Sequence, residues 1–393
     1  MKAGEITSDY TVETIETMDG FNDLQNDWER LYKLKEGITI FFSYEIIKKY
    51  FEIILKNFKK VKIKTFIIKN KNGRIIAIFP FIFETTLFPS FLSLKELGLK
   101  HDYLIDFYFF LIDPAENQKQ IIQQLFQYLN KRKKMWDIIK IKSIPEDEHL
   151  LKNFLSIIKE NYKFIIGQIE TLVIDCEGDY DNYIKNMKGR YRKTIRRQYR
   201  RLEFLGNVKV IEIKHSEDVE EGLKFFYDIE DSGWKGRQGT SLKKSFYGEY
   251  YKELANYFSK HNKFRLYFLK VGDKYIAGIY SLIDNGIIYN IKTGYSEEFY
   301  QYSPSNVLFY LLSEQLFKDE TIKKIDYYGP YVKYEEVFGK KTRTRFNITI
   351  CNKKILSISY FIILKMLQKL NYPFPKGSLR NRTTKKLMKF FYN

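Results

Sequence analysis

A dense run of positive charge marks the segment MKGRYRKTIRRQYRRLEFLG, from Met187 to Gly206. Eight of the fourteen positions from Lys188 to Arg201 are Lys or Arg, and six of the fifteen arginines of the chain lie there. A guanidinium group presents a planar fork that can bind a phosphate or a carboxylate at two points. We therefore expect part of this segment, with Arg196 and Arg197 as candidates, to bind ligand phosphate; a solvated helix face is the alternative.

Two further cations stand in the segment SGWKGRQGTSL, from Ser232 to Leu242, where Lys235 and Arg237 alternate with glycines. Glycine gives a loop conformational freedom, and a flexible loop with two cations can close over an anionic ligand. Trp234, Lys235 and Arg237 are therefore candidate ligand-binding residues. The alternative is a surface turn that a largely buried Trp234 anchors.

The tetrapeptide SPSN, from Ser303 to Asn306, has the pattern of a helix start. Ser303 is a suitable N-cap, and Pro304 suits the first helical position. The N–H groups of Ser305 and Asn306 would then point outward at the positive end of the helix dipole, which is an anion site. An ordinary capped helix without a ligand is the alternative.

Composition sets the frame for these candidates. The chain has 393 residues, 44% of them hydrophobic, which is enough for two domains with their own cores. Its net charge of +19 favours acidic partners such as phosphates, nucleic acid or an anionic membrane surface. Two cysteines and four scattered histidines predict neither a disulfide framework nor a metal site. The N-terminus lacks a signal-like apolar stretch, and the longest apolar run, Ile355 to Leu367, is shorter than the roughly 20 residues of a membrane span, so we expect a cytoplasmic protein.

Two stretches about 200 positions apart share one pattern, FIIKNKNGRIIAIFPFI from Phe66 and LYFLKVGDKYIAGIYSL from Leu266. Each reads as a strand, a polar turn and a second strand, with Ala77 and Ala277 at the same place. Helical patterns precede both. We interpret this as two similar α/β domains that arose by duplication, with coincidence as the alternative. The expected boundaries are 1–165 and 166–350, followed by an amphipathic basic segment, 351–393.

Three further stretches carry a family resemblance: SGWKGRQGTSL, YIAGIYSLIDNGIIYNIKTGYSEEFYQYSPSNVL from Tyr275, and IDYYGPYVKYEEVFG from Ile325. Together with the order of the elements, they resemble the CelD-like (BioF-type, FemAB-like) acetyltransferase domain family of the GNAT superfamily. The resemblance covers about 175–339 well and the first half more loosely. It implies an α/β (α+β) fold of tandem GNAT-like domains, each a mixed, mostly antiparallel sheet flanked by helices.

The resemblance also implies site residues. The strand Ile287–Thr293 would expose backbone groups to an extended acyl donor, and the following loop would offer amides to its phosphates. The residues for donor binding are Ile291, Thr293, Gln301, Ser303, Ser305 and Asn306. The residues for catalysis are Tyr327, Tyr328, Lys333 and Lys292, with a tyrosine protonating the leaving thiolate. Candidates for a general base are Asp326, Glu297, Glu335 and Glu336. The loop departs from the usual GNAT form because Pro304 and Asn306 stand at its glycine positions.

The function that the resemblance implies is transfer of an acyl group from acyl-CoA, with acetyl-CoA as the co-substrate, to an amine or hydroxyl. The acceptor would be polar, with cell-envelope or polysaccharide-related molecules as candidates, and no cofactor would be permanently bound. The N-terminal domain would be structural or acceptor-binding. The alternatives are an aminoacyl-tRNA donor, for which the arginine segment suits tRNA phosphates, and a non-catalytic GNAT-fold binding module. Plain nucleic-acid binding ranks lowest, and the C-terminal tail is a candidate contact for an anionic membrane at its inner surface.

Overall fold

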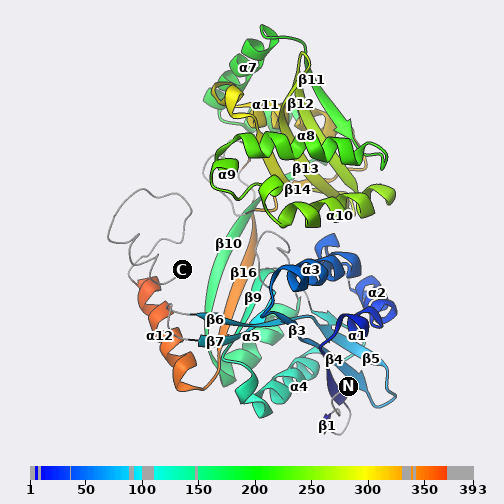
Figure 1. The fold of residues 1–393 in the computed structure, drawn as a ribbon, viewed down its shortest axis with the longest axis vertical. Helices are drawn as coiled ribbons and strands as arrows, with labels where there is room; N and C mark the ends of the chain where they lie inside the picture. Colours follow the sequence, from blue (N-terminus) through cyan, green and yellow to red (C-terminus); the bar gives the residue numbers. More distant parts are fainter. Residues whose placement is uncertain are drawn as a thin grey trace. The chain divides into compact units, whose positions relative to one another are not determined.

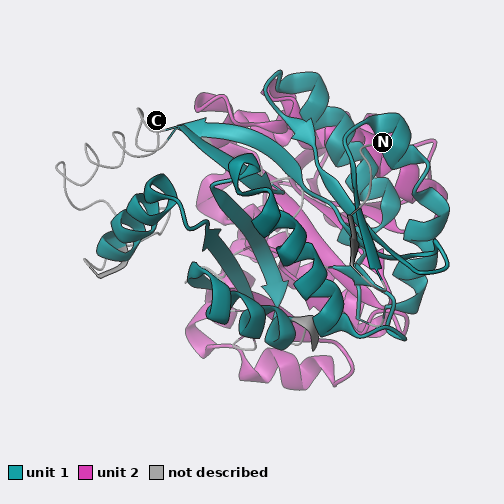
Figure 2. Ribbon diagram, turned by 90° about the horizontal axis from the view of Figure 1, so that it is seen from below, with its two compact units in different colours: residues 1–168, 345–393 teal, residues 169–344 magenta. Residues whose placement is uncertain are grey.

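The structure, a computed structural model, describes residues 5–7, 10–35, 37–87, 93–99, 110–146, 149–329, 338–339 and 342–369. The chain divides into two compact units (Figure 1, Figure 2). Unit 1 comprises Met1–Gln168 and Arg345–Asn393, and unit 2 comprises Ile169–Thr344. Strand β10 (Lys163–Asp175) carries the chain from unit 1 into unit 2, and strand β16 (Thr342–Cys351) carries it back. The sequence analysis assigns residues up to 350 to the C-terminal domain, whereas residues Arg345–Cys351 of β16 pair with β9 of unit 1.

Unit 1 holds two strand ladders. The first is antiparallel, in the order β1-β2-β4-β5-β8, and its strands are β1 (Glu5–Thr7), β2 (Tyr10–Ile15), β4 (Thr65–Asn70), β5 (Ile75–Phe79) and β8 (Leu111–Ile112). The second runs β3-β6-β7-β9-β16, with β7 and β9 parallel and the other pairs antiparallel. Its remaining strands are β3 (Lys62–Ile63), β6 (Ile82–Leu87), β7 (Ser93–Gly98) and β9 (Ile138–Pro145).

Amphipathic helices cover these ladders and bury aromatic residues such as Trp28 and Trp136. Asn117 caps one of them, α4, by accepting a hydrogen bond from the amide of Gln120 at 3.1 Å. The helices of unit 1 are α1 (Met18–Asn22), α2 (Gln25–Leu34), α3 (Tyr44–Asn57), α4 (Gln118–Lys131), α5 (His149–Asn161) and α12 (Ile355–Lys369). Among the described residues, no helix combines the length and the apolar character that crossing a bilayer requires.

Unit 2 is built on one ladder in the order β11-β12-β13-β14-β15-β10, in which β14 and β15 are parallel and the other pairs antiparallel. The strands are β11 (Val208–Ile213), β12 (Phe264–Val271), β13 (Lys274–Asp284), β14 (Ile287–Tyr295) and β15 (Lys324–Asp326). The helices are α6 (Tyr180–Asn186), α7 (Gly189–Glu203), α8 (Val219–Ser232), α9 (Trp234–Arg237), α10 (Tyr247–Lys260) and α11 (Pro304–Lys318).

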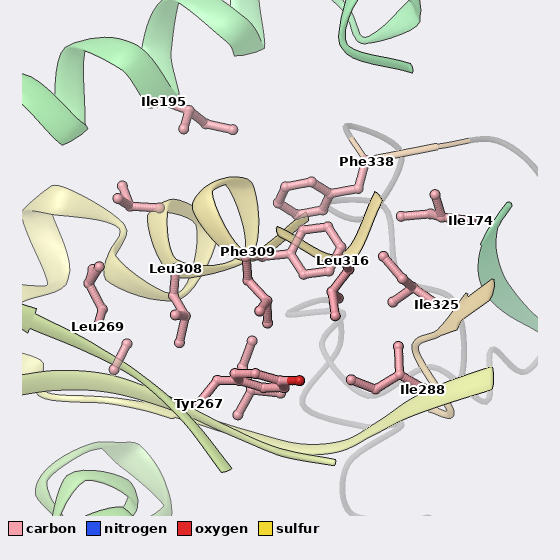
Figure 3. Close-up of a cluster of buried hydrophobic side chains, with 14 of the residues drawn as sticks. Ile174, Ile195, Tyr267, Leu269, Ile288, Leu308, Phe309, Leu316, Ile325 and Phe338 are labelled. Carbon is pink, nitrogen blue, oxygen red and sulfur yellow. The ribbon is translucent and has the colours of Figure 1, made fainter. Parts of the chain in front are cut away.

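Helices cover both faces of this sheet. On one face, Leu308 and Leu316 of α11 point toward the strands that carry Tyr267 and Ile288, and the ring of Phe309 lies beside that of Phe338 (Figure 3). The side chains of α7 join the same core. Helices α8 and α10 pack on the opposite face, where the next residues along each strand point. Residues of β13 and β14 can therefore be assigned to an α11 face or an α10 face by their register.

The two predicted hairpins are both present, and they share a detail that the sequence does not show. The ladder of each hairpin shifts register at the same place, between Ile68 and Lys69 in one and between Leu269 and Lys270 in the other. In each, the repeated alanine, Ala77 or Ala277, pairs with the residue just before the shift. The strand order β2-β4-β5-β8 in unit 1 matches β11-β12-β13-β14 in unit 2. A shared bulge and a shared order favour duplication over coincidence.

Helix α8 lies close to the centre of the unit 2 sheet because two glycines face it. Gly278 of β13 and Gly294 of β14 are direct cross-strand partners. A Cβ atom on Gly278 would lie 2.8 Å from Cδ2 of Phe226, and one on Gly294 would lie 3.3 Å from Cα of Glu230. A side chain at either position would push α8 away from the strands that it covers.

We expect Gly278→Ala to lower the free energy of unfolding by about 1–3 kcal/mol, because the added methyl group overpacks a core that holds the buried Phe226. Gly178→Ala is the matched control, since no heavy atom lies within 4 Å of the position that its Cβ would take. That variant should differ from the wild type by about 0.5 kcal/mol or less. Urea unfolding checks both, and equal losses would contradict the close packing of α8.

Candidate active site

Strands β14 and β15 are parallel, and they pair over a short distance only. Their ladder joins Ile287–Tyr289 to Lys324–Asp326, where β15 ends, while β14 continues to Tyr295 with β13 on its other side. Ligands of open α/β sheets bind outside the carboxyl ends of the strands. The part of β14 from Asn290 to Tyr295, which no described strand pairs with on the β15 side, lies at that edge. Of the stretch that the sequence analysis expects to be exposed, Ile291 and Thr293 belong to this free part.

A bulge in β14 brings two buried polar side chains together at the point where the strands part. The register shifts between Tyr280 and Ser281, so that Ser281 pairs with Asn290 and Ile291 has no partner on β13. Ser281 is fully buried and Asn290 is 5% exposed, and the Ser281 hydroxyl donates to Oδ1 of Asn290 at 2.9 Å. Both side chains lie on the α11 face, because alternate residues of a strand share a face and the pair two positions along, Ile283 and Ile288, belongs to that core.

The amide nitrogen of Asn290 has no hydrogen-bond partner among the described residues, although it is buried. Burying an N–H donor without an acceptor costs about 1–3 kcal/mol. A ligand that brings a carbonyl oxygen to this place would remove that cost. The position is therefore a candidate site for an acceptor atom of a ligand.

The start of α11 differs from the anion site that the sequence predicts. Pro304 does occupy the first turn, but Ser303 has a left-handed backbone, with φ 49° and ψ 54°, and its side chain makes no capping hydrogen bond. Ser303 therefore occupies the predicted N-cap position, but its side chain does not cap the helix. The preceding 3-10 helix, η4 (Glu297–Tyr302), leads directly into α11, and this sharp junction requires the left-handed residue.

Most amides of the first turn of α11 are already bonded. The N–H of Ser303 donates to the carbonyl of Tyr300 at 3.0 Å, and the N–H of Asn306 donates to the carbonyl of Ser303 at 3.0 Å. Since Pro304 has no N–H, Ser305 is the remaining donor at this helix start. Its hydroxyl is also buried without a partner among the described residues. Gln301, the other candidate of this loop, is exposed in η4.

Tyr327 and Tyr328, the two phenols expected to protonate a leaving group, point to different faces of the sheet. The ring of Tyr327 lies 4.9 Å from that of Phe309, between centroids, within the α11-face core. Tyr328 is buried close to Tyr251 of α10. Burial raises the pKa of Tyr251 well above its ordinary value, and the neighbouring Tyr328 phenol adds to the rise. The two tyrosines therefore cannot share one role.

Lys292 belongs to the α10 face together with Tyr328. Its Nζ lies 5.1 Å from the ring centroid of Tyr251, a cation–π contact. Its register partner, Tyr280, is fully buried and also packs against Tyr251. Lys292 thus lies against a buried ring instead of pointing to solvent from an outer face of the sheet. Lys333, the remaining catalytic candidate, lies outside the described residues.

The predicted flexible loop from Ser232 to Leu242 is instead partly helical, and its cations already have carboxylate partners. Lys235 forms an ion pair with the buried Glu230, and its Nζ also lies 3.4 Å from the carbonyl oxygen of Thr293 on β14. Arg237 donates two hydrogen bonds to Glu297, of 2.6 and 3.1 Å. The side chain of Trp234, at the start of α9, lies outside the described part of the chain.

Close packing, rather than mobility, explains the central glycine of this segment. A Cβ atom on Gly236 would lie 1.8 Å from the carbonyl oxygen of Asp231, which is impossible without moving the backbone. The carboxylate of Asp231 also accepts a 2.6 Å hydrogen bond from Ser241 and pairs with Lys244 at 3.0 Å. Polar contacts within and beside the segment therefore fix its backbone. The prediction of a flexible loop is wrong for the residues of α9, which are helical.

Helix α7 turns most of its cations to solvent while Ile195, Gln198 and Leu202 are buried. Arg196 and Arg197 are exposed, and among the described residues no carboxylate forms an ion pair with either. Two arginines of α7 contact tyrosines at and just before the start of α11. Arg196 Nε lies 3.4 Å from the hydroxyl of Tyr310, and the Arg201 guanidinium lies 4.7 Å from the ring centroid of Tyr302.

The two general-base candidates that the structure describes, Asp326 and Glu297, each form an ion pair with an arginine. Asp326 is 1% exposed, accepts a 2.7 Å hydrogen bond from the amide of Tyr328 and pairs with Arg343 at 2.7 Å. Glu297 is bound to Arg237. Glu335 and Glu336 lie outside the described residues. A carboxylate that is already hydrogen-bonded to an arginine is a weak base, which favours catalysis by positioning.

Sequence analysis overlooked the polar residues that matter most at this edge: Ser281, Asn290 and Glu230. The signal was available, because Asn290 interrupts the apolar strand GIIYNIKTGY and Ser281 interrupts IAGIYSLID. A polar residue in the middle of a predicted central strand is buried and must be satisfied or functional. Among the described residues, no group of His, Cys, Asp or Glu has the arrangement of a metal site.

Comparisons with known proteins bear on the fold. A family model described as an acetyltransferase (GNAT) domain matches residues 189–336, which begin with α7 and include β14, α11 and β15. FemX resembles this chain at 12% identity, over 88% of this chain and 98% of FemX, with a TM-score of 0.55. A conserved protein of unknown function from Bacteroides thetaiotaomicron resembles it at 9% identity, over 86% of this chain and 99% of that one, with a TM-score of 0.50. No curated protein matches the sequence.

These comparisons confirm the predicted fold class. The chain has a mixed α/β fold with sheets flanked by helices, and the match to the GNAT domain model lies within unit 2. The likeness to FemX extends over both units, because it covers most of each chain. The identities are low, so the likeness concerns the fold alone.

Both cysteines are buried, Cys176 at 5% exposure and Cys351 at 0%, and burial raises the pKa of each thiol to about 12. We predict that the native protein at pH 8 reacts with a thiol reagent such as Ellman's reagent far more slowly than the unfolded chain does, because the thiolate is the nucleophile. The folded pKa lies above the unfolded one, so the free energy of unfolding should fall as the pH rises from about 8.5 toward 12. Rapid reaction of the native protein with either thiol would contradict this assignment.

Proposed function

We propose that unit 2 is an acyltransferase of the CelD-like, FemAB-like kind that moves an acyl group from acyl-CoA, with acetyl-CoA as the donor, to an amine or hydroxyl of a polar acceptor. One observation carries the proposal: at the edge where β14 and β15 part, the buried amide nitrogen of Asn290 has no hydrogen-bond partner within the part of the chain that the structure describes. In a GNAT-type fold this edge is where an extended acyl donor would lie. The carbonyl oxygen of the acyl group would then accept the Asn290 hydrogen bond.

The chemistry that this edge can support is acyl transfer by positioning. The acceptor nitrogen or oxygen attacks the acyl carbon, the thioester C–S bond breaks, coenzyme A leaves as the thiolate, and the acceptor proton passes to solvent or to the thiolate. Charge develops on the acyl oxygen during the attack. A donor fixed in advance near that oxygen stabilises it, and the Ser281 hydroxyl holds the Asn290 amide in a fixed orientation for this purpose. Holding donor and acceptor together supplies much of the remaining acceleration.

Other residues take supporting roles in this proposal. The backbone of Ile291 and Thr293 would lie along the donor, and Ser305 would meet a donor phosphate at the start of α11. Lys292 and Tyr328, on the α10 face, would serve the acceptor side, and Tyr327 the leaving thiolate. Unit 1 would be structural or acceptor-binding. An envelope or polysaccharide-related acceptor follows from the family resemblance.

The proposal is tested by thermal denaturation with acetyl-CoA. A ligand that binds the folded state alone stabilises it, by about 2.7 kcal/mol at a hundred times its dissociation constant, so the wild-type midpoint should rise. Asn290→Ala removes the amide nitrogen that has no partner among the described residues, but it also takes the acceptor from the buried Ser281 hydroxyl. It should therefore lower the free energy of unfolding by about 1–3 kcal/mol and weaken the acetyl-CoA effect by about tenfold in affinity.

Asn352→Ala is the matched control for that variant. Asn352 is also buried, but its amide donates to the carbonyls of Lys133 and Trp136 at 3.0 and 2.8 Å in unit 1. Its loss should lower stability by about 1–3 kcal/mol and leave the acetyl-CoA shift intact. A wild-type midpoint that acetyl-CoA does not move would end the acyl-CoA version of the proposal. The remaining hypotheses would then be a non-catalytic binding module and a transferase with a different acyl donor.

A second candidate donor is aminoacyl-tRNA, and the observation that favours it is the exposed cationic face of α7 beside the start of α11. Arg196 and Arg197 have no carboxylate partner among the described residues, so they are available for phosphate. A row of phosphates, as in tRNA, would engage more of this helix than one coenzyme A could.

For this donor, filter binding of tRNA at two salt concentrations is decisive. The wild type should bind tRNA at low salt, and Arg196→Ala with Arg197→Ala should lower the salt slope by about two, while the free energy of unfolding changes by less than about 1 kcal/mol. Lys59→Ala with Lys60→Ala is the control, because it removes the same charge from two exposed neighbours in unit 1. Indifference to tRNA at low salt would exclude this donor, and equal losses in stability and binding would make the arginines ordinary scaffold.

A further inference from the structure

Helix α12 carries a stripe of exposed apolar side chains. Ile355 is 86% exposed, Ile358 39%, Ile362 46% and Met366 58%. With 3.6 residues per turn, these four positions fall within about 80° of the helix circumference. Scattered apolar residues on a surface are ordinary, but a continuous row on one face marks an interaction site. We call these four residues the α12 stripe.

The opposite side of α12 holds the helix on unit 1. Tyr360, 5% exposed, packs with Leu94 of β7, Ile138 of β9 and Cys351 of β16, and Leu356 and Leu364 join this cluster. Figure 1 shows α12 beside β6 and β7 of the same unit. The helix is therefore fixed by one apolar face while it presents a second one outward. A helix that is apolar on two sides needs two partners.

The charge around α12 is of one sign. From Asn352 to Asn393 the sequence contains ten Lys or Arg residues and no Asp or Glu. Lys365 lies within about 20° of Ile358 around the helix, and so borders the α12 stripe. A long lysine side chain can keep its ammonium group in water while its methylenes cover apolar surface. The segment itself thus combines an apolar row with cations and no carboxylate, and one of these cations, Lys354, is paired with Asp137 of unit 1 at 2.7 Å.

We propose that α12 binds to the surface of a membrane that contains anionic phospholipids, with the α12 stripe in contact with the acyl chains and the surrounding cations at the headgroups. A helix with this composition lies in the plane of the interface. Each lysine or arginine near an anionic leaflet contributes about 1 kcal/mol. At 15 residues, α12 is too short to cross the bilayer. This assignment stands independently of acyl transfer.

Charge decides between a lipid surface and the other occupants. A second copy of the chain would bring a second set of cations, without any carboxylate, against the first. The chain beyond Lys369 adds six more Lys or Arg residues of the same sign. Both of these occupants place like charges together, which destabilises the contact. Anionic headgroups supply the complementary charge.

Co-sedimentation of the full chain with vesicles tests the proposal. The wild type should bind vesicles of phosphatidylcholine mixed with phosphatidylglycerol and should bind phosphatidylcholine alone much more weakly. Ile362→Asp should weaken binding to the mixed vesicles by about tenfold or more, since it removes an apolar contact and adds a negative charge. Leu34→Asp on α2 is the matched control, because Leu34 is 42% exposed and the charge change is identical. It should leave the binding nearly unchanged.

Each other outcome overturns the proposal. If the wild-type protein does not bind the mixed vesicles, lipid is not the partner of the α12 stripe. Equal losses for Ile362→Asp and Leu34→Asp would show that net charge, and not the α12 stripe, governs binding. Sedimentation velocity adds a separate arm: a wild-type dimer that Ile362→Asp dissociates, without vesicle binding, would assign the stripe to a second copy. Ile358→Asp repeats the test should Ile362→Asp lower the thermal midpoint.

Discussion

The early end of the ladder between the parallel strands β14 and β15 is the constraint on which unit 2 depends. Only three residue pairs join them, and the chain then turns away after Asp326. The buried carboxylate of Asp326 fixes this turn, because it accepts the amide of Tyr328 and pairs with Arg343. Tyr328 adopts a left-handed backbone with φ 61°, which costs energy for a residue other than glycine. The strain maintains an edge of β14 that a longer ladder would cover.

Several features of unit 2 follow from that parting of strands. The bulge in β14 turns Asn290 toward α11 and Lys292 toward α10, so the free stretch of the strand presents different chemistry to each face of the sheet. The glycine pair Gly278 and Gly294 lets α8 approach closely and brings Glu230 beside the strand. Lys235, paired with Glu230, then reaches the carbonyl of Thr293. The edge is therefore surrounded by side chains that are already hydrogen-bonded to one another.

Sequence patterns located the elements better than they located the site. The hairpins and most helices were predictable because their signals are local: a polar turn between apolar runs, or an Asn117 cap before a periodic stretch. The errors arose where a residue's partner is distant in sequence. Nothing near Arg237 reveals that Glu297 will bind it, 60 positions away. Ser303 looks like a cap until the 3-10 helix before it imposes a left-handed backbone. That the Asn290 amide has no partner among the described residues depends on how the folded strands are placed around it, so no local pattern can show it.

The division of the chain has a consequence for how the protein is made. Unit 1 is assembled from both ends of the sequence, and its strand β9 receives β16 only after residues up to Cys351 have emerged from the ribosome. All of unit 2 is synthesised before that point. During translation, β9 therefore has an open edge along Ile138–Pro145 while an entire second unit is being completed, and such edges invite pairing with other chains. Unit 2 can close its own ladder first, so vectorial synthesis would finish the second half of the molecule before the first.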